Sequence, residues 1–429
     1  MLQRRSESSC GPVAFEQEAV VKRVSLVSLA SLVLSICAAS APAARAQTLK
    51  TLVNFSGSNG ANPYATVIQG KDGNFYGTTF AGGANSEGTV FEITAEGKFR
   101  TLYNFCSLAN CADGSLPQAS LVQGVNGNLY GTVSYGGAHN AGGIFEITAT
   151  GGVKLIYSFC SRAGCADGST PSAALLLGRN GNFYGTTWTG GVGGGGTVFE
   201  VTATGALKTL HSFCSQPNCA DGEKPTAALI QARNGNFWGT TSSGGSAGDG
   251  TVFKMSPTGA LTTLHSFNGS DGSNAVAGLV QATDGNFYGI TELGGDNNAG
   301  TVFQITPAAA LTTIYKFCSQ SGCDDGANPE GQLIQASDGN LYGTTFQGGV
   351  TAQGTIFKIT TAGALTTVYT FCSLSGCADG QFPVASLIQA SNGDFYGTTV
   401  LSGVFGQGIV YGLLNGSDAV MEVGSAERP

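Results

Sequence analysis

The sequence predicts an all-β fold, a seven-bladed β-propeller. Three observations predict it: one unit recurs seven times, each unit holds four strand-like segments, and the two ends of the repeated region complete one another. Gly is 67 of the 429 residues and charged residues are only 11% of the chain. This composition favours short strands joined by tight turns over helices.

The repeated unit is clearest in a hexapeptide that ends in Tyr-Gly or Trp-Gly. Its final glycines lie 54 residues apart, except for one interval of 50 residues that lacks a four-residue insertion with two cysteines. The seven copies are residues 72–77, 126–131, 180–185, 234–239, 284–289, 338–343 and 392–397. A period of this length is typical of propeller blades.

Four strand-like segments, which we name a to d, fill each unit. In the third copy they span residues 172–178, 182–188, 196–202 and 206–213. An Asn-Gly or Asp-Gly pair stands between a and b, and this pair predicts a hairpin with a type I′ turn. Four antiparallel strands per unit fit a propeller blade better than a solenoid coil.

The ends of the repeated region predict how the ring closes. Residues 48–55 read as a d strand without a, b or c, and the last copy stops after its c strand at residues 408–414. An open array would leave an unpaired strand edge at each end. We therefore expect the N-terminal strand to complete the last blade of a propeller over residues 47–414, followed by a short polar tail, residues 415–429.

Residues 1–46 have the pattern of a secretory signal peptide with a long n-region. Lys22 and Arg23 precede an apolar run, residues 24–41, and Ala44-Arg45-Ala46 supplies a small-x-small cleavage site. The run is short for a membrane span, so we expect no stable transmembrane span after processing. The protein is expected to be exported, to the extracellular space or cell surface, with the periplasm as the alternative.

Ten cysteines in the repeats form five C-x4-C pairs. Regularly spaced, even-numbered cysteines in an exported chain indicate disulfides. A C-x4-C pair offers zinc only two ligands, and the three histidines lie in unrelated positions, so no metal or other cofactor is expected. The expected bridges are Cys106–Cys111, Cys160–Cys165, Cys214–Cys219, Cys318–Cys323 and Cys372–Cys377.

The repeat resembles that of a known family. The pattern YGTT-x-x-GG-x4-GTVF-x-IT-x-x-G, which residues 76–97 and 342–363 carry with small variations, is similar to the GloVer (Gloeobacter/Verrucomicrobia) repeat of exported bacterial proteins. The resemblance implies tandem copies, a secretion signal and, in many members, a C-terminal surface anchor. Residues 417–429 lack the apolar tail and basic stop of the anchored members.

The predicted blade geometry sorts the loops between two faces. The d–a and b–c loops share one face, which holds the cysteine insertions and seven dissimilar tetrapeptides, at 84–87, 138–141, 192–195, 246–249, 296–299, 350–353 and 404–407. A ligand is expected at this face or at the channel mouth there. Two recurring residues are expected to be structural: the Asp after each insertion in an Asx turn, and the Gln of strand a in a hydrogen bond between blades.

Residues that break the repeat are the candidate ligand-binding residues. Trp188 and Glu292 are irregular at the third position after the Tyr-Gly glycine, and several acidic residues join them on the same face. The candidates are Trp188, Glu223, Asp249, Glu292, Asp296, Asp324 and Glu330, beside Asp325. Carboxylates and exposed rings suit sugars; the alternative is solvated surface charge with aromatic side chains that pack between blades.

Three functions remain open at this point. The first is a binding module for an extracellular glycan or a protein partner, which we expect to be monomeric. The second is a polysaccharide hydrolase or lyase with Glu292 and Glu330 as acid and base. The third is a structural envelope protein. A net charge of −8 without a Lys/Arg-rich run argues against nucleic acid as a partner.

Overall fold

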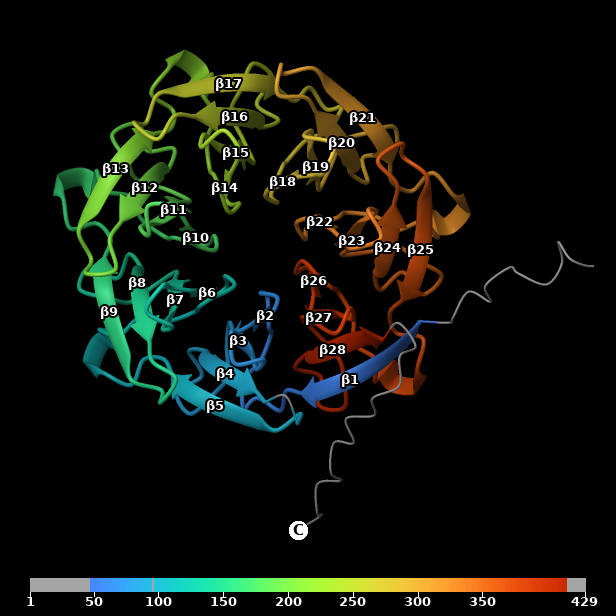
Figure 1. Cartoon of the computed structure of the whole chain (residues 1–429), viewed down its shortest axis with the longest axis horizontal. Helices are drawn as coiled ribbons and strands as arrows, with labels where there is room; N and C mark the ends of the chain where they lie inside the picture. The colour runs from blue at the N-terminus through green and yellow to red at the C-terminus, as the bar shows by residue number, and fades with distance from the viewer. Residues whose placement is uncertain (1–46, 95, 415–429) are drawn as a thin grey trace, which may run out of the picture. The chain divides into compact units, whose positions relative to one another are not determined.

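The computed structural model describes residues 47–94 and 96–414, which form seven four-stranded antiparallel sheets arranged around a ring (Figure 1). The predicted seven-bladed β-propeller is confirmed. The predicted signal segment, 1–46, and the tail, 415–429, lie outside the described residues. We number the blades 1 to 7 in chain order of their inner strands.

The a strands lie nearest the centre of the ring and the d strands lie at its outside (Figure 1). The a strands are β2 (Ile68–Gln69), β6 (Val122–Gln123), β10 (Leu176–Leu177), β14 (Ile230–Gln231), β18 (Val280–Gln281), β22 (Ile334–Gln335) and β26 (Ile388–Gln389). The b strands are β3 (Phe75–Thr79), β7 (Leu129–Val133), β11 (Phe183–Thr187), β15 (Phe237–Thr241), β19 (Phe287–Thr291), β23 (Leu341–Thr345) and β27 (Phe395–Thr399).

The two outer strands of each blade are at least as long as its b strand. The c strands are β4 (Thr89–Ile93), β8 (Gly143–Ile147), β12 (Thr197–Val201), β16 (Thr251–Met255), β20 (Thr301–Ile305), β24 (Thr355–Ile359) and β28 (Ile409–Leu414). The d strands are β5 (Phe99–Asn104), β9 (Val153–Ser158), β13 (Leu207–Ser212), β17 (Leu261–Ser266), β21 (Leu311–Lys316), β25 (Leu365–Thr370) and, in blade 7, β1 (Thr48–Asn54).

The N-terminal strand closes the ring as the sequence predicts. β1 pairs antiparallel with β28, from Thr48 opposite Leu414 to Asn54 opposite Ile409. Blade 7 thus takes its outer strand from the start of the chain and its three inner strands from the end (Figure 1). This pairing covers the edges that an open array would expose.

The a–b hairpins are present, but the predicted type I′ turn is wrong. In blade 1 the N–H of Gly73 donates to the carbonyl of Gly70, and the N–H of Gly70 donates to the carbonyl of Asn74. Gly73 has φ +86°, whereas Asp72 is not among the residues with positive φ. The connection is therefore a three-residue loop in which only the glycine is left-handed, and the Asx residue instead accepts the N–H of Asn74.

The recurring Tyr-Gly pair is explained by packing across the blade. Gly77 lies opposite Phe91 in the b–c ladder, and a Cβ on Gly77 would lie 2.4 Å from Phe91 Cζ. The phenylalanine ring of strand c therefore packs over the glycine of strand b, which leaves no room for a side chain there.

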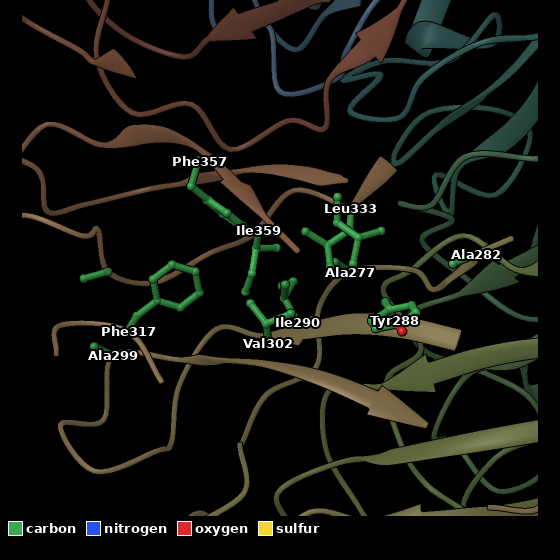
Figure 2. Close-up of a cluster of buried hydrophobic side chains, with 12 residues drawn as sticks. Ala277, Ala282, Tyr288, Ile290, Ala299, Val302, Phe317, Leu333, Phe357 and Ile359 are labelled. Atoms are coloured by element: carbon green, nitrogen blue, oxygen red, sulfur yellow. The ribbon is translucent and has the colours of Figure 1, made fainter. Parts of the chain in front are cut away.

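The hydrophobic core lies between blades rather than within them. Figure 2 shows the cluster between blades 5 and 6, in which Tyr288, Ile290 and Val302 of blade 5 pack with Leu333 and Ile359 of blade 6. Corresponding clusters lie between the other pairs of neighbouring blades. Each blade is thus stabilised by two neighbours, which explains why the ring must close.

The recurring Gln of strand a joins neighbouring blades, as predicted. The side-chain Oε1 of Gln123 accepts the backbone N–H of Lys71 in the preceding blade at 3.1 Å, and its Nε2 donates to Gly127 of its own hairpin. The same inter-blade bond is made by Gln69, Gln231, Gln281, Gln335 and Gln389. Leu177 of blade 3 breaks this series.

Candidate functional site

The d–a and b–c loops share one face, which we call the variable face. Short backbone bridges join the two kinds of loop in every blade, as between Ala61 and Ala81 in blade 1 or between Glu223 and Ser243 in blade 4. The variable tetrapeptides and the cysteine insertions therefore lie side by side, as the sequence predicts.

The five predicted disulfides are all present, each within one d–a loop. Each loop contains a three-residue 3-10 helix, namely η1 (Ala109–Cys111), η2 (Ala163–Cys165), η3 (Pro217–Cys219), η4 (Ser321–Cys323) and η5 (Ser375–Cys377). In the part of the chain that the structure describes, these are the only helices, and none is long enough to cross a membrane.

The Asp after each insertion is a buried brace of the loop. Asp325 is fully buried and accepts hydrogen bonds from the N–H and hydroxyl of Ser319, the N–H of Gln320 and the hydroxyl of Tyr315. Its role is structural, as expected. However, its carboxylate accepts hydrogen bonds from residues five and six positions earlier in the chain, and it does not form the predicted Asx turn with residues that follow it. Within residues 47–94 and 96–414, no group of three or more His, Cys, Asp or Glu side chains is arranged to hold a metal ion.

Three positions of each blade lie near the channel mouth, by which we mean the end of the central channel on the variable face, and the second of them lines the channel. The first is a left-handed residue in the d–a loop, the second lies two residues later, and the third follows strand b. In blade 5 these are Asn274, Val276 and Glu292. The N–H of Glu292 donates to the carbonyl of Asn274 at 3.0 Å. The N–H of Asn274 donates to the backbone carbonyl of Asp249 in the preceding blade at 2.9 Å.

The same backbone arrangement recurs in all seven blades, although the side chains differ. The left-handed residues are Asn62, Leu116, Thr170, Lys224, Asn274, Asn328 and Phe382, with φ between 52° and 59°. Because non-glycine residues rarely adopt this conformation, the backbone at the mouth is held by its hydrogen bonds rather than by local preference.

A cavity of about 180 Å³ opens at this mouth. Its wall is built from small residues at equivalent positions, Ala65, Ala119, Ala173, Ala227, Ala277, Gly331 and Ala385. The residue before each of these also lines the cavity, and these residues differ from blade to blade: Tyr64, Gln118, Ser172, Thr226, Val276, Glu330 and Val384. The small residues that recur thus form the wall of the cavity. The residues that differ between blades determine which polar, apolar and charged groups line it.

Aromatic rings dominate the mouth at blades 6, 7 and 1. Tyr64 packs edge to face against Phe80 at 5.2 Å between ring centroids, and Phe346 of blade 6 packs against Phe382 of blade 7 at 4.8 Å. Tyr64 is 41% exposed. Trp188, the predicted candidate in blade 3, is 40% exposed at the position that Glu292 occupies in blade 5.

Two carboxylates lie together between blades 5 and 6. Glu330 lines the cavity. Its burial, and to a lesser extent the nearby charge of Glu292, raise the pKa of Glu330 to about 7. Burial also raises the pKa of Glu292, whose Oε2 accepts a 2.6 Å hydrogen bond from Asn274. A carboxylic acid that titrates near neutral pH can donate or accept a proton there.

The junction of blades 5 and 6 departs from the repeat at further positions. In the other six junctions a threonine of strand b donates its hydroxyl to a backbone carbonyl of the next blade, as Thr240 does to Ala277 at 2.9 Å. Blade 5 has Ile290 instead, which lies inside the cluster of Figure 2. Gln332 lines the cavity and reaches back to the carbonyl of Leu279 at 2.8 Å.

The remaining predicted acidic residues lie elsewhere on the variable face. Glu223 lies 3.8 Å from Lys224, Asp249 accepts the hydroxyl of Ser273 at 2.7 Å, and Asp296 pairs with Lys316. Asp324 is exposed in the loop that η4 belongs to. Of the predicted acidic set, the structure brings Glu292 and Glu330 together at the cavity mouth.

Sequence reasoning missed the ring of second positions, including Tyr64, Gln118 and Val384. A signal was available: these residues follow a Pro in six copies and precede an Ala in six copies, and each copy has a different residue there except for the valines of blades 5 and 7. Phe382 was missed because nothing in the sequence indicates that its side chain reaches Phe346 of the preceding blade.

The model of the Gloeobacter/Verrucomicrobia repeat matches residues 41–176, 162–335 and 320–427. The chain belongs to this family. The comparison with curated proteins finds no match. This family member therefore has to be interpreted from its own site.

Solved structures of similar shape support the fold alone. A streptogramin B lyase aligns with a TM-score of 0.59 at 13% identity, over 87% of this chain and 99% of that one. A virginiamycin B lyase from Staphylococcus aureus gives 0.55 at 13% identity, over 86% and 99%. The extracellular domain of a protein from B. thetaiotaomicron, described as a hybrid two-component system, gives 0.56 at 11% identity, over 85% of this chain and 39% of that one.

Proposed function

We propose that this family member is an exported binding module that holds an oligosaccharide at the channel mouth of its propeller. One observation carries the proposal: the positions that differ between copies converge on a cavity whose wall is otherwise repeated seven times. In a repeat protein the scaffold needs only the constant positions. Variation that gathers at one concave site is what recognition of a particular ligand would require.

The chemistry of the mouth suits a sugar. Trp188 and Tyr64 present exposed rings on which the apolar face of a pyranose can pack. Carboxylates and amides on the same face, such as those of Glu292 and Gln118, can form hydrogen bonds with the hydroxyl groups of a sugar. The Nε2 of Gln118 donates to Ser134 at 2.6 Å, which fixes the amide at the edge of the cavity.

Export to the extracellular space or cell surface belongs to the same proposal, with the periplasm as the alternative compartment. Five disulfides in the d–a loops favour an oxidising compartment. The charged, apolar and small-residue segments of residues 22–46 have the order of a cleavable signal. We also propose that the protein acts as a monomer.

A glycan array probed with the purified protein tests the proposal. Tyr64 and Tyr135 offer a matched pair, because they are 41% and 43% exposed on the same face but only Tyr64 lines the cavity. We expect Tyr64→Ala to weaken binding of the best glycan about tenfold or more, and Tyr135→Ala to leave it unchanged. Equal losses in the two variants, or binding of no glycan, would contradict the proposal; binding of a protein instead would assign a different partner to this face.

A polysaccharide hydrolase or lyase is the second candidate, because the pKa of Glu330 is raised to about 7. An acid of this kind beside the carboxylate of Glu292 could protonate a leaving oxygen at neutral pH. Release of reducing ends or unsaturated products from a bound glycan, lost in Glu330→Gln, would support it. Binding without product would leave the first proposal, and no ligand of either kind would favour a structural role in the envelope. Propellers serve all three roles, so the fold does not decide.

A further inference from the structure

The cavity at the channel mouth is enclosed on its sides by the ring. Each blade contributes three consecutive residues to its lining, as Tyr64, Ala65 and Thr66 do in blade 1. The pairing of β1 with β28 closes the ring, and a hydrophobic cluster fills each of its seven junctions. Hydrogen bonds also cross the junctions at the level of the cavity, as from Thr132 of blade 2 to the carbonyl of Ala173 in blade 3 at 3.1 Å. A ligand therefore reaches the cavity along the axis of the ring and not between blades.

The cavity is also small. Its lining ends at the third residue of each set, before the a strand begins; in blade 1 it ends at Thr66, and β2 starts at Ile68. Its volume of about 180 Å³ is below the roughly 300–1,000 Å³ of pockets that bury a drug-sized molecule. The space therefore suits a single sugar unit rather than a row of units.

This enclosure limits which part of a glycan can enter the cavity. An inner segment of a linear glycan continues in both directions, so it lies across a mouth of this shape and does not enter it. A terminal sugar continues in one direction only, so it can enter along the axis while the rest of the chain remains outside. A small cavity that a closed ring surrounds therefore favours a chain end over the middle of a chain.

The charge of the lining limits the chemistry of the entering sugar. Among the described residues that line the cavity, Glu330 is the only charged one, and no lysine or arginine lies among them. A carboxylate, sulfate or phosphate on the entering sugar would meet a like charge without a cation to bind it. Gln118, Ser120 and Ser386, which also line the cavity, are neutral donors and acceptors that suit sugar hydroxyl groups.

We infer that the protein recognises the end of a glycan chain, and that an uncharged terminal sugar enters the cavity along the axis of the ring. The inference rests on the proposed function and narrows it from oligosaccharides in general to those with a free, uncharged end. The units that follow the terminal sugar lie against the aromatic rings of the mouth, such as that of Tyr64. The reducing and the non-reducing end of a chain share this geometry, and the experiment distinguishes between them.

Calorimetric titration with uncharged tetrasaccharides tests this inference. The probes are the β-1,4-linked and β-1,3-linked tetramers of glucose and the β-1,4-linked tetramers of mannose and N-acetylglucosamine. Each is used free, with its reducing sugar opened to the alditol, and with a benzylidene acetal on its non-reducing sugar. For the tetramer that binds best, we expect one of the two blocks to weaken binding about tenfold or more, because the blocked sugar loses its hydrogen bonds in the cavity, and the other to leave binding unchanged. The block that weakens binding identifies the end that enters, and a carboxylate placed on that same sugar should weaken binding to a similar extent.

Two matched variants complete the test. Ala174→Leu narrows the cavity in blade 3, and the ring accommodates a longer side chain at this position, since blade 6 has Gln332 there. We expect Ala174→Leu to bind the best tetramer about tenfold more weakly. Ala247→Leu, the same change at an exposed residue of the variable loop in blade 4, should bind it as the wild type does.

The results that would overturn the inference differ from those that would remove the proposed function. Full binding with either end blocked, equal weakening by the two blocks, unchanged binding by Ala174→Leu, or tighter binding of the carboxylated tetramer would overturn the inference and leave the proposed function intact. Binding of no glycan would remove both.

Discussion

His211 Nε2 lies 3.1 Å from Oδ2 of Asp221, which is fully buried in the loop closed by Cys214 and Cys219. In four other blades the hydroxyl of a tyrosine makes this contact, as Tyr157 does with Asp167 at 2.8 Å. The histidine therefore takes the place of tyrosine in a hydrogen bond that holds the loop.

Replacement of Asp221 should destabilise the protein more than removal of the disulfide in the same loop. Its carboxylate accepts hydrogen bonds from the N–H and hydroxyl of Ser215 and from the N–H of Gln216. Asp221→Ala leaves these donors unsatisfied, so we expect a loss of about 3 kcal/mol in the free energy of unfolding. Cys214→Ser with Cys219→Ser should cost about 2 kcal/mol or less, because the closed loop is short. Urea unfolding of both variants measures the difference; the reverse order would show that the disulfide is the main brace.

Acid should weaken the stabilisation that the Asp221 carboxylate provides. Burial acts to raise the pKa of Asp221, but the hydrogen bonds from Ser215 and the backbone outweigh it and hold the pKa below its usual value. A lowered pKa in the folded state stabilises the fold above the unfolded pKa, near 4, and this stabilisation is lost as the pH falls. Asp221→Asn should therefore show a smaller loss of stability between about pH 5 and pH 3 than the wild type.

Glu330 should make stability depend on pH in the opposite direction. Burial and the charge of Glu292 raise its pKa to about 7, so the folded state retains a proton that the unfolded state releases near pH 4.5. The wild type should therefore lose roughly 2 kcal/mol of stability as the pH rises from about 4.5 to 7.5. Glu330→Gln should remove this slope. Thermal unfolding across that range, with Asp324→Asn as the control, measures it; parallel curves for wild type and Glu330→Gln would contradict the prediction.

The propeller could be predicted from the sequence because its evidence is periodic. Seven copies with four strand segments each, and a d strand displaced to the N-terminus, leave few alternatives to a closed ring. The predicted turn type of the a–b hairpin was wrong, because an Asp-Gly pair fits both a type I′ turn and a three-residue loop with one left-handed glycine. Sequence does not separate the two, because in each the glycine takes a positive φ.

The candidate site could be predicted only in part. Glu292 and Glu330 stood out as breaks in the repeat, but their proximity depends on the packing of blade 5 against blade 6. Tyr64 and Phe382 were missed because their surroundings form only in the closed ring. All seven blades line the cavity at Tyr64, and Phe382 packs against Phe346 of the preceding blade.

Tyr411→Phe should stabilise the protein. Tyr411 is fully buried, packs against Phe371, and its hydroxyl has no hydrogen-bond partner among the described residues. The corresponding residue of the other six blades is phenylalanine, as at Phe357. Removal of an unsatisfied buried hydroxyl should raise the free energy of unfolding by about 1 kcal/mol. Phe357→Tyr is the control and should lower it; a loss of stability in Tyr411→Phe would mean that the hydroxyl has a partner.

Closure by β1 can be tested by a change in chain order. Thr48 lies opposite Leu414, so a three-residue link such as Ala-Thr-Gly from Leu414 to Thr48 would recreate the c–d turn of the other blades. We expect a circular permutant with this link, and with new termini in the variable loop at residues 192–195, to unfold in one cooperative transition with a midpoint close to that of the wild type, because every strand keeps its neighbours. Deletion of residues 47–54 leaves blade 7 with three strands and should lower the midpoint by at least 10 °C or abolish cooperativity, on the order of several kcal/mol. A permutant that fails to fold while the deletion remains stable would show that β1 is dispensable for the ring.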